Sequence, residues 1–244
     1  MRWLLVAIVS LATPAAAVEC KDVSFDGGTY TLCEVNITQD EIRLFLRDPD
    51  TDRPFGSFDN VATKLANADQ TLLFAMNAGM YHADRSPVGH YVESGTERAP
   101  VISTDGPGNF GLLPNGVFCV GDTHARVIET RRFLREAPNC THASQSGPML
   151  VIDGQLHPRF LKDSDSRYIR NGVGTSGDGR TVWFAMSHAS VNFHTFGRFF
   201  RDGIKVPQAL YFDGNISRLY ALGLGRNDGG FPMGPIVGVV ADAE

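Results

Sequence analysis

ASQSGPMLVIDG, residues 143–154, is the stretch from which the rest of this chain is best interpreted. A Ser-Gln-Ser-Gly-Pro turn leads into the apolar run 149–152, which predicts a buried strand, and Asp153-Gly154 predicts the turn after it. The small residues before the strand let a ligand approach the backbone, and Gln145 brings both a hydrogen-bond donor and an acceptor. An ordinary loop before a core strand has the same pattern, so the other segments must decide between structure and function.

Polar residues follow other predicted strands in the same way. The apolar run 71–76 leads directly to Asn77, and the run 208–212 closes on Asp213-Gly214. The segment 170–174 contains glycines that suit a backbone passing near a ligand, and its arginine can bind a phosphate or carboxylate through two parallel hydrogen bonds. Turn-forming or solvated side chains explain several of these residues equally well. The candidate site residues are Asn77, His82, Gln145, Ser146, Gly147, Arg170, His188, Asp213, Ser217 and Arg218.

Short alternating or apolar runs predict that strands dominate the fold. Strands at 29–35 and 41–46, with a turn at 36–40 between them, predict a hairpin. Asn115-Gly116 is a strong signal for a second hairpin.

Two helices are expected. Residues 57–68 place apolar side chains on one face, and residues 191–202 carry phenylalanines at helical spacing. Core packing is the preferred explanation of these phenylalanines, and a cofactor site the weaker one. Residues 126–136 fit either a strand or a short helix, because periodicity alone does not separate the two.

The N-terminus has the features of an export signal. A basic start at Met1-Arg2, an apolar run at 3–11 and the small residues Ala15-Ala16-Ala17 predict a signal peptide over 1–17 and a mature chain from near Val18. The apolar run is shorter than the roughly 20 residues that a bilayer span requires, and no later stretch is long enough. We therefore expect a periplasmic or secreted protein.

The four cysteines, Cys20, Cys33, Cys119 and Cys140, fit that compartment. An oxidising environment favours pairing, and of the possible connectivities we prefer the two local ones, first with second and third with fourth. None of the spacings is the short Cys-x-x-Cys of zinc or redox sites, so a structural role is expected.

Length and charge narrow the function further. Residues 18–244 are expected to form one globular domain. The net charge of −5 and the pI of about 5.8, with scattered basic residues, argue against nucleic-acid binding. The nucleophile-elbow, phosphate-loop, zinc-protease and EF-hand signatures do not occur, and no cofactor is expected. The remaining arginines, amides and acids suit an anionic, oxygen-rich substrate.

Four segments occur in a recognisable order. They are Asn-Ala-Gly-Met-Tyr at 77–81, Ser-Gln-Ser-Gly-Pro-Met-Leu at 144–150, Arg-Asn-Gly-Val-Gly at 170–174, and Tyr-Phe-Asp-Gly-Asn-Ile-Ser-Arg-Leu-Tyr at 211–220. With them the chain resembles the phosphodiester glycosidase family over residues 72–240, most closely a compact group of exported bacterial members. The resemblance implies an α+β domain with a central, largely antiparallel sheet. It also implies cleavage of the glycosyl–phosphate linkage of a sugar-1-phosphodiester. The positions that match the family's motifs are Asn77, Gly79, Ser146, Gly147, Arg170, Asp213 and Gly214, so the resemblance adds Gly79 and Gly214 to the candidate site.

The resemblance and the residue chemistry together suggest a mechanism. We expect Arg170, with Asn77 and Gln145, to bind the phosphodiester, while Asp213 acts at the anomeric side as base or nucleophile. Because a phosphate ester is a weakly basic leaving group, charge neutralisation matters more than general-acid help. His82 or His188 can supply a proton where one is needed.

Two other functions remain open at this point. A non-catalytic envelope protein that binds glycans or an anionic polymer would use the same polar strand ends. A serine hydrolase built on Ser146 and His188 is the weaker alternative, because Ser-Gly-Pro lacks a recognised activating frame.

Overall fold

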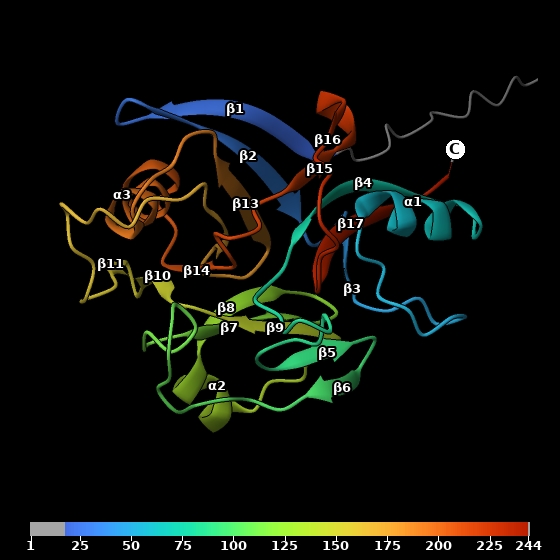
Figure 1. Ribbon diagram of the computed structural model, residues 1–244, viewed down its shortest axis with the longest axis horizontal. Coiled ribbons are helices and arrows are strands. Elements are labelled where there is room, and N and C mark those ends of the chain that lie inside the picture. Colours follow the sequence, from blue (N-terminus) through green and yellow to red (C-terminus); the bar gives the residue numbers. More distant parts are fainter. Residues whose placement is uncertain (1–17, 244) are drawn as a thin grey trace, which may run out of the picture.

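Antiparallel strands in three sheets form most of the regular secondary structure of residues 18–243, the part of the chain that this computed structural model describes (Figure 1). Sheet I has the strand order β1 (Glu19–Phe25), β2 (Gly28–Asn36), β13 (Thr181–Ser187), β12 (Asn171–Thr175), β14 (Gln208–Tyr211), β10 (Met149–Ile152) and β11 (Gln155–Leu156). Sheet II has the order β16 (Arg226–Asn227), β15 (Leu219–Ala221), β4 (Gln70–Asn77), β17 (Ile236–Asp242) and β3 (Glu41–Phe45). Sheet III has the order β6 (Thr96–Ala99), β5 (Tyr91–Glu93), β9 (His142–Ser146), β7 (Gly116–Val120) and β8 (Ala125–Glu129). The expected α+β class with largely antiparallel pairing is confirmed.

The inner faces of the three sheets share one apolar core. Phe184 on β13 is fully buried, and its ring lies 4.8 Å from that of Phe74 on β4 and 5.8 Å from that of Phe118 on β7, measured between centroids. One side chain of sheet I therefore contacts an aromatic ring of each other sheet. The core that holds the sheets together is thus continuous through all three.

One helical segment packs against each sheet. α1 (Phe58–Ala66) packs on sheet II, α2 (Thr130–Glu136) on sheet III, and α3 (Phe193–Arg198), continued by the π-helix η1 (Phe199–Ile204), on sheet I; a single 3₁₀ turn, η2 (Leu222–Leu224), follows β15. α1 begins because Ser57 Oγ accepts a hydrogen bond from the backbone N–H of Asn60 at 3.2 Å, and Asn192 Oδ1 caps α3 by accepting from the N–H of Thr195 at 2.9 Å. Both predicted helices are confirmed. The ambiguous residues 126–136 contain strand β8 followed by helix α2.

The hairpin predicted from residues 29–35 and 41–46 is wrong, although both strands form. β2 lies between β1 and β13, so neither of its edges is free for β3. The turn at 36–40 instead sends the chain to sheet II, where β3 pairs with β17. The residue pattern of a strand indicates its faces, and it does not indicate which neighbour occupies its edge.

Asn115-Gly116 is not a hairpin turn either. Gly116 is the first residue of β7, where a side chain would overlap the sulfur of Met149. Asn115 Nδ2 donates to the carbonyl of Phe110 at 3.0 Å, and its Oδ1 accepts from the hydroxyl of Thr130 at 2.7 Å. Packing and buried hydrogen bonds therefore explain this dipeptide.

The stretch 143–154 has less turn and more strand than expected. Residues 142–146 form β9, the central strand of sheet III, and only Gly147 with the cis-bonded Pro148 connects it to β10. The predicted turn at Asp153-Gly154 is confirmed, with left-handed φ values of 47° and 77°.

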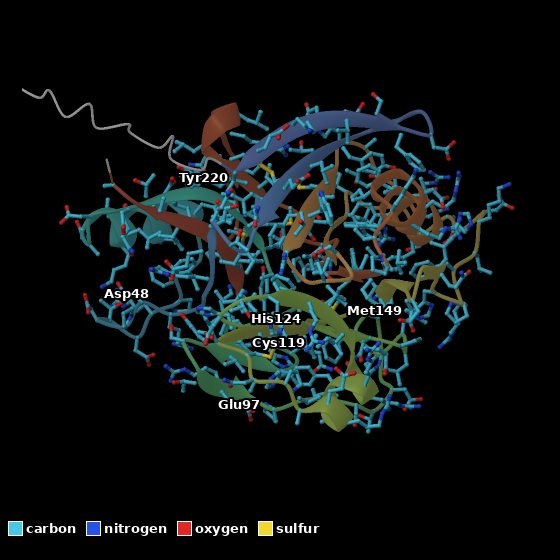
Figure 2. The ribbon with its side chains drawn as sticks, turned by 180° about the vertical axis from the view of Figure 1, so that it is seen from behind. Asp48, Glu97, Cys119, His124, Met149 and Tyr220 are labelled. Atoms are coloured by element: carbon cyan, nitrogen blue, oxygen red, sulfur yellow. A yellow bond between two sulfur atoms is a disulfide. The ribbon has the colours of Figure 1, made fainter. Side chains whose placement is uncertain are left out.

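Two disulfides are present, with the preferred connectivity. Cys20–Cys33 joins β1 to β2, and Cys119–Cys140 joins β7 to the segment that leads into β9 (Figure 2). The predicted signal peptide, residues 1–17, lies outside the described residues.

Candidate active site

Two buried asparagines join sheets I and II at the end of β4. Oδ1 of Asn77 accepts hydrogen bonds from Nδ2 of Asn171 and, at 3.0 Å, from the backbone N–H of Arg218. Oδ1 of Asn171, the first residue of β12, accepts from the backbone N–H of Asp213 at 3.1 Å. Neither asparagine has exposed surface. The pair therefore fixes both ends of the turn 213–218 at the junction of the two sheets.

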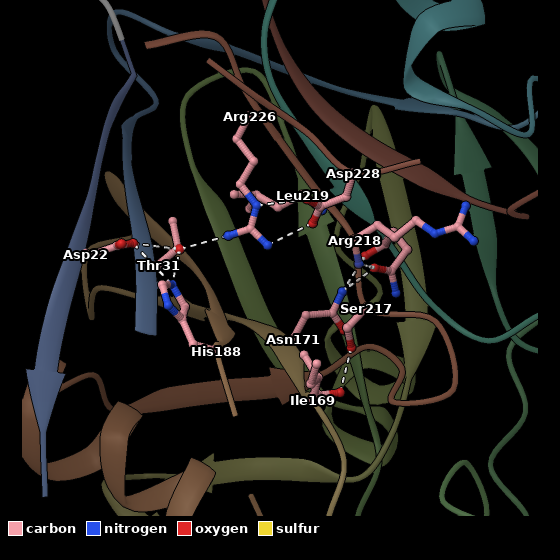
Figure 3. A network of polar contacts seen from close by, with 11 residues as sticks. Asp22, Thr31, Ile169, Asn171, His188, Ser217, Arg218, Leu219, Arg226 and Asp228 are labelled. Atoms are coloured by element: carbon pink, nitrogen blue, oxygen red, sulfur yellow. Dashed lines mark hydrogen bonds and ion pairs between the residues drawn. The ribbon is translucent and has the colours of Figure 1, made fainter. Parts of the chain in front are cut away.

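Asp213 begins that turn. Its Oδ1 accepts hydrogen bonds from the backbone N–H groups of Gly214 at 2.6 Å and Asn215 at 3.0 Å. The hydroxyl of Ser217 donates to the carbonyl of Ile169 at 2.8 Å (Figure 3) and to that of Asp213 at 3.1 Å, which closes the turn from the other side. Asp213 is thus a turn-forming residue whose carboxyl group is held in a defined place.

Arg170 is fully buried immediately before β12. Its Nε donates to the carbonyl of Val191 at 2.8 Å and its Nη2 to the carbonyl of Ser166 at 2.9 Å, whereas Nη1 has no hydrogen-bond partner among residues 18–243. The guanidinium carbon lies 3.6 Å from the ring centroid of Phe193 and 5.2 Å from that of Tyr211. These contacts replace an ion pair with aromatic faces and backbone carbonyls.

Arg170 and Arg218 have an unusual status in the described part of the chain. They are its only buried lysine, arginine, aspartate or glutamate residues, and no carboxylate lies within ion-pair distance of either one. Arg218 is 9% exposed, and its Nη1 donates to the carbonyl of Phe231. A buried cation without an anion is costly, so each of these two arginines is a position at which a bound anion would be stabilised.

A cavity of about 450 Å³ opens beside Asp213. Aromatic side chains form much of its wall, and Asp213 is the only acidic residue among those that line it. Tyr168 and Tyr211 line this cavity and also lie against the guanidinium of Arg170, which does not line it. Arg170 therefore lies behind the cavity wall, in contact with two of the side chains that form it. The lining residues are Met80, Tyr81, Val88, Pro107, Gly108, Asn109, Phe110, Tyr168, Tyr211, Asp213 and Asn215.

The electrostatics of the cavity are set mainly by burial. Burial raises the pKa of the Asp213 carboxyl, and the backbone N–H groups that it accepts from offset part of that rise. Burial also raises the pKa of Tyr211, so its hydroxyl stays protonated at neutral pH. The pKa of Tyr81 is raised by burial and by Asp213, while the nearby Arg85 and Arg218 lower it. Tyr81 therefore lies within electrostatic range of both Asp213 and Arg218.

Several of the other predicted residues have packing roles around this cavity. The hydroxyl of Ser146 donates to the carbonyl of Phe212 at 2.7 Å, next to Asp213. Gly79 has a left-handed φ of 147° and faces the hydroxyl of Ser144. Gly147 packs against Asn115, and Gly214 packs against the hydroxyl of Tyr211. These close approaches involve the protein itself, where a ligand had been expected.

Three predicted residues lie elsewhere. Every hydrogen-bonding atom of the Gln145 amide has a partner in sheet III or the nearby loops, at His90, Ile102 and Thr130. His82 is exposed in the turn 82–86 and does not line the cavity. His188 Nε2 lies 2.8 Å from the hydroxyl of Thr31 and 3.2 Å from Asp22, at the far end of the polar network in Figure 3. The structure therefore gives no contact between His188 and Ser146 that a serine hydrolase would need.

Sequence reasoning missed Asn171, Tyr81, Tyr168 and Tyr211. A signal for Tyr211 existed, because alternation along a strand places residues 211 and 213 on the same side. Asn171 and Tyr81 lie inside the quoted motifs, next to residues that were selected. Tyr168 lies in a polar loop that carries no periodic signal.

Two general observations complete the description of residues 18–243. No group of three or more histidine, cysteine, aspartate or glutamate side chains is arranged to hold a metal ion. None of the helices in this range has the length and apolar character needed to cross a membrane.

Comparison with known sequences identifies relatives of the whole region that builds this site. A family model described as phosphodiester glycosidase matches residues 70–237. The uncharacterized protein YigE of Escherichia coli (strain K12) is 30% identical over 212 residues, which cover 86% of this chain and 82% of that protein.

Solved structures share the fold at low sequence identity. The catalytic domain of zebrafish N-acetylglucosamine-1-phosphodiester alpha-N-acetylglucosaminidase, auto-inhibited by its pro-peptide, matches with a TM-score of 0.60 at 11% identity; the match covers 93% of this chain and 84% of that one. A predicted exported protein of Burkholderia pseudomallei matches with a TM-score of 0.57 at 9% identity, over 87% of this chain and 74% of that one.

Proposed function

Because this chain belongs to the phosphodiester glycosidase family, we propose that it is an exported hydrolase that cleaves the glycosyl–phosphate bond of a sugar-1-phosphodiester. On this proposal the sugar occupies the cavity beside Asp213. The aromatic faces of Tyr81, Tyr168 and Phe110 in the cavity wall suit the apolar face of a sugar ring.

The observation that carries the proposal is the buried, unpaired guanidinium of Arg170. A phosphodiester bound next to Tyr211 would supply the negative charge that Arg170 lacks, in a site where little water weakens the attraction. Arg218 does not line the cavity either, but its charge lowers the pKa of Tyr81 in the cavity wall, so it adds to the positive potential there. Asn77 has a buried Nδ2 without a partner among the described residues, but it does not line the cavity, so we assign it the positioning of the turn 213–218. Gln145 is omitted from this scheme because its amide is already saturated.

Asp213 is proposed to act at the anomeric carbon. As a nucleophile, its carboxylate would displace the phosphate monoester, which leaves with the electron pair, and water would then hydrolyse the glycosyl ester. As a base, it would instead remove a proton from the attacking water in a single displacement. Either route fits a cavity with one acid, because a phosphate monoester leaves without a general acid. We assign no proton transfer to His82 or His188, which lie outside the cavity.

The test is turnover of a panel of sugar-1-phosphodiesters with a chromogenic aglycone. The wild-type protein should release product, and Asp213→Asn and Arg170→Ala should each lower kcat/KM at least about a hundredfold, the size typical of one acid–base or electrostatic group. Asp242→Asn and Arg131→Ala are matched controls, because these residues are exposed and have no side-chain hydrogen bond. Circular dichroism must show that each variant is folded, since Arg170 also bonds two carbonyls.

The outcomes separate the candidate functions. Near-normal turnover by a folded Asp213→Asn or Arg170→Ala protein would remove that residue from the scheme. Binding of the diesters without product would favour a non-catalytic protein that binds glycans or an anionic polymer.

The export part of the proposal has its own support and test. The two disulfides favour an oxidising compartment, and the N-terminus resembles a signal peptide over 1–17. Mass spectrometry of the protein from a periplasmic extract should find a mature chain, the proposed domain 18–244, that starts near Val18. An intact N-terminus on cytoplasmic protein would contradict export.

A further inference from the structure

The hydroxyl of Tyr211 is a buried donor without a partner. Tyr211 is the last residue of β14 and has no exposed surface, and its ring packs edge-on against Phe193 with centroids 4.8 Å apart. Its Oη has no hydrogen-bond partner of normal length among residues 18–243, although the Arg170 guanidinium lies close enough to lower the pKa of the hydroxyl. Burying a hydroxyl without a hydrogen bond is unfavourable. The hydroxyls of Tyr30 and Tyr91 have the same status, so it is the place of Tyr211 in the cavity wall that points to a ligand as its partner.

This hydroxyl lies where the cavity, Asp213 and Arg170 meet. A side chain on Gly214 would overlap Oη, which places the hydroxyl against the backbone that follows Asp213. Tyr211 and Asp213 line the same cavity. The guanidinium of Arg170 lies on the tyrosine ring, 5.2 Å from its centroid. Tyr211 therefore stands between a buried cation and the space that holds the substrate.

We propose that Tyr211 is a catalytic residue whose hydroxyl donates a hydrogen bond to a phosphate oxygen of the substrate. The positive charge of Arg170 polarises this hydroxyl and so strengthens the hydrogen bond. The inference rests on the proposed function and adds a residue to it. It also resolves how Arg170, which does not line the cavity, can act on the phosphate. No covalent step involves Tyr211, and its proton stays on the phenolic oxygen.

The protonation state fits a donor and not a nucleophile. Burial raises the pKa of Tyr211 and the carboxylate of Asp213 raises it further, while Arg170 lowers it less than burial raises it. When the glycosyl–phosphate bond breaks, the phosphate gains negative charge. A hydrogen bond from Tyr211 would then strengthen in the transition state, so its loss should lower kcat more than it raises KM.

The decisive variant is Tyr211→Phe, which keeps the ring contacts with Arg170 and Phe193 and removes only the hydroxyl. We expect kcat for a sugar-1-phosphodiester to fall at least about tenfold, while the melting temperature of the free protein stays equal or rises. Tyr30→Phe is the matched control. Its Oη is also buried without a partner, but Tyr30 stacks on Phe199 in the core of sheet I and does not line the cavity. It should show the same thermal behaviour with unchanged turnover.

Wild-type kcat in Tyr211→Phe, or equal losses in Tyr211→Phe and Tyr30→Phe, would overturn the inference. Thermal stabilisation by glucose 1-phosphate separates it from the proposed function. If the wild-type protein cleaves no diester, the proposed catalysis fails. In that case, thermal stabilisation of the wild type but not of Tyr211→Phe by glucose 1-phosphate would still support the hydroxyl as a donor to phosphate. Equal stabilisation of both proteins, or of neither, would count against it.

Discussion

Arg170, Tyr211 and Asn77 each bury a polar atom that has no hydrogen-bond partner in the described part of the chain. A group of this kind costs about 1–3 kcal/mol of folding free energy. Other buried polar side chains nearby, such as Asn171 and Ser146, have their hydrogen bonds in place. Unsatisfied buried atoms also occur away from the cavity, at Tyr30 and Tyr91 for example, so burial alone does not identify a site. Tyr211 differs because it lines the cavity and lies against Arg170, and there a bound anion would offset the cost.

Glu93 gives a residue-scale prediction outside the site. It lies on β5 and lines a separate cavity, and burial raises its pKa to about 7. In the unfolded chain its carboxyl ionises near the ordinary value of 4.5, so the native state binds more protons between these values. Stability should therefore fall as pH rises from about 4.5 to 7. Glu93→Gln should remove this loss and stabilise the protein by roughly 2 kcal/mol at high pH.

Urea unfolding at pH 5 and pH 8 checks this expectation. Glu93→Gln should raise the free energy of unfolding more at pH 8 than at pH 5. Glu97→Gln on the adjacent β6 is the control, because its side chain is 60% exposed. An equal gain at both pH values would mean that the Glu93 charge does not limit stability.

Helix α3 links stability to the site at the scale of one element. Asn192 caps it and also donates from Nδ2 to the carbonyls of Lys162 and Ser164, and Phe193, the first helical residue, lies against Arg170. Asn192→Ala should lower the free energy of unfolding by about 1–2 kcal/mol and also reduce turnover, because the cap holds Phe193 in place. Ser57→Ala removes the cap of α1, which lies on sheet II, and should lower stability with little change in kcat. Thermal unfolding and steady-state kinetics of the two variants measure stability and turnover. An equal loss of turnover in Ser57→Ala would show that general destabilisation explains the loss in Asn192→Ala.

The sequence predicts these elements better than it predicts their pairing. Apolar periodicity located the strands around 29–35, 71–76 and 208–212, because each must bury one face. It placed 29–35 and 41–46 in one hairpin, since nothing local records that β1 and β13 already occupy both edges of β2. The glycine of Asn115-Gly116 was misinterpreted for a similar reason, because the methionine sulfur that excludes a side chain there comes from β10.

At the scale of the whole molecule, the two disulfides predict how the chain responds to a reducing environment. Cys119–Cys140 closes a loop with a sequence separation of 21, whereas Cys20–Cys33 closes one of 13 between strands that already pair. Replacing Cys119 and Cys140 by alanine should cost roughly 3 kcal/mol, and replacing Cys20 and Cys33 should cost less. Chemical denaturation of both double variants tests this order. Equal stability of oxidised and reduced wild-type protein would contradict a stabilising role.

The site shows the same limit of sequence reasoning on a larger scale. The ordered motifs located Asn77, Arg170 and Asp213, and hydrogen bonds through Asn171 bring the first and last of these together. In the sequence, Gln145 has the same features as these three residues. Its strand, however, runs through the middle of sheet III, where its amide is hydrogen-bonded to the backbone of a loop. Whether a polar residue at a strand end faces a cavity depends on how the three sheets pack together. This packing is set by contacts between distant segments, so the sequence of one segment does not predict it.

The asparagine junction between sheets I and II has an evolutionary consequence. Asn77 and Asn171 hold the turn 213–218 from inside the molecule, whereas much of the cavity wall comes from segments such as 107–110 and Tyr168 that are outside the regular strands and helices. Mutations in those segments can change the shape of the cavity, and so the molecule that fits it, without moving the Asp213 carboxylate. On the proposed function, proteins that share this scaffold can therefore diverge in substrate specificity while they keep the same carboxylate in the same position.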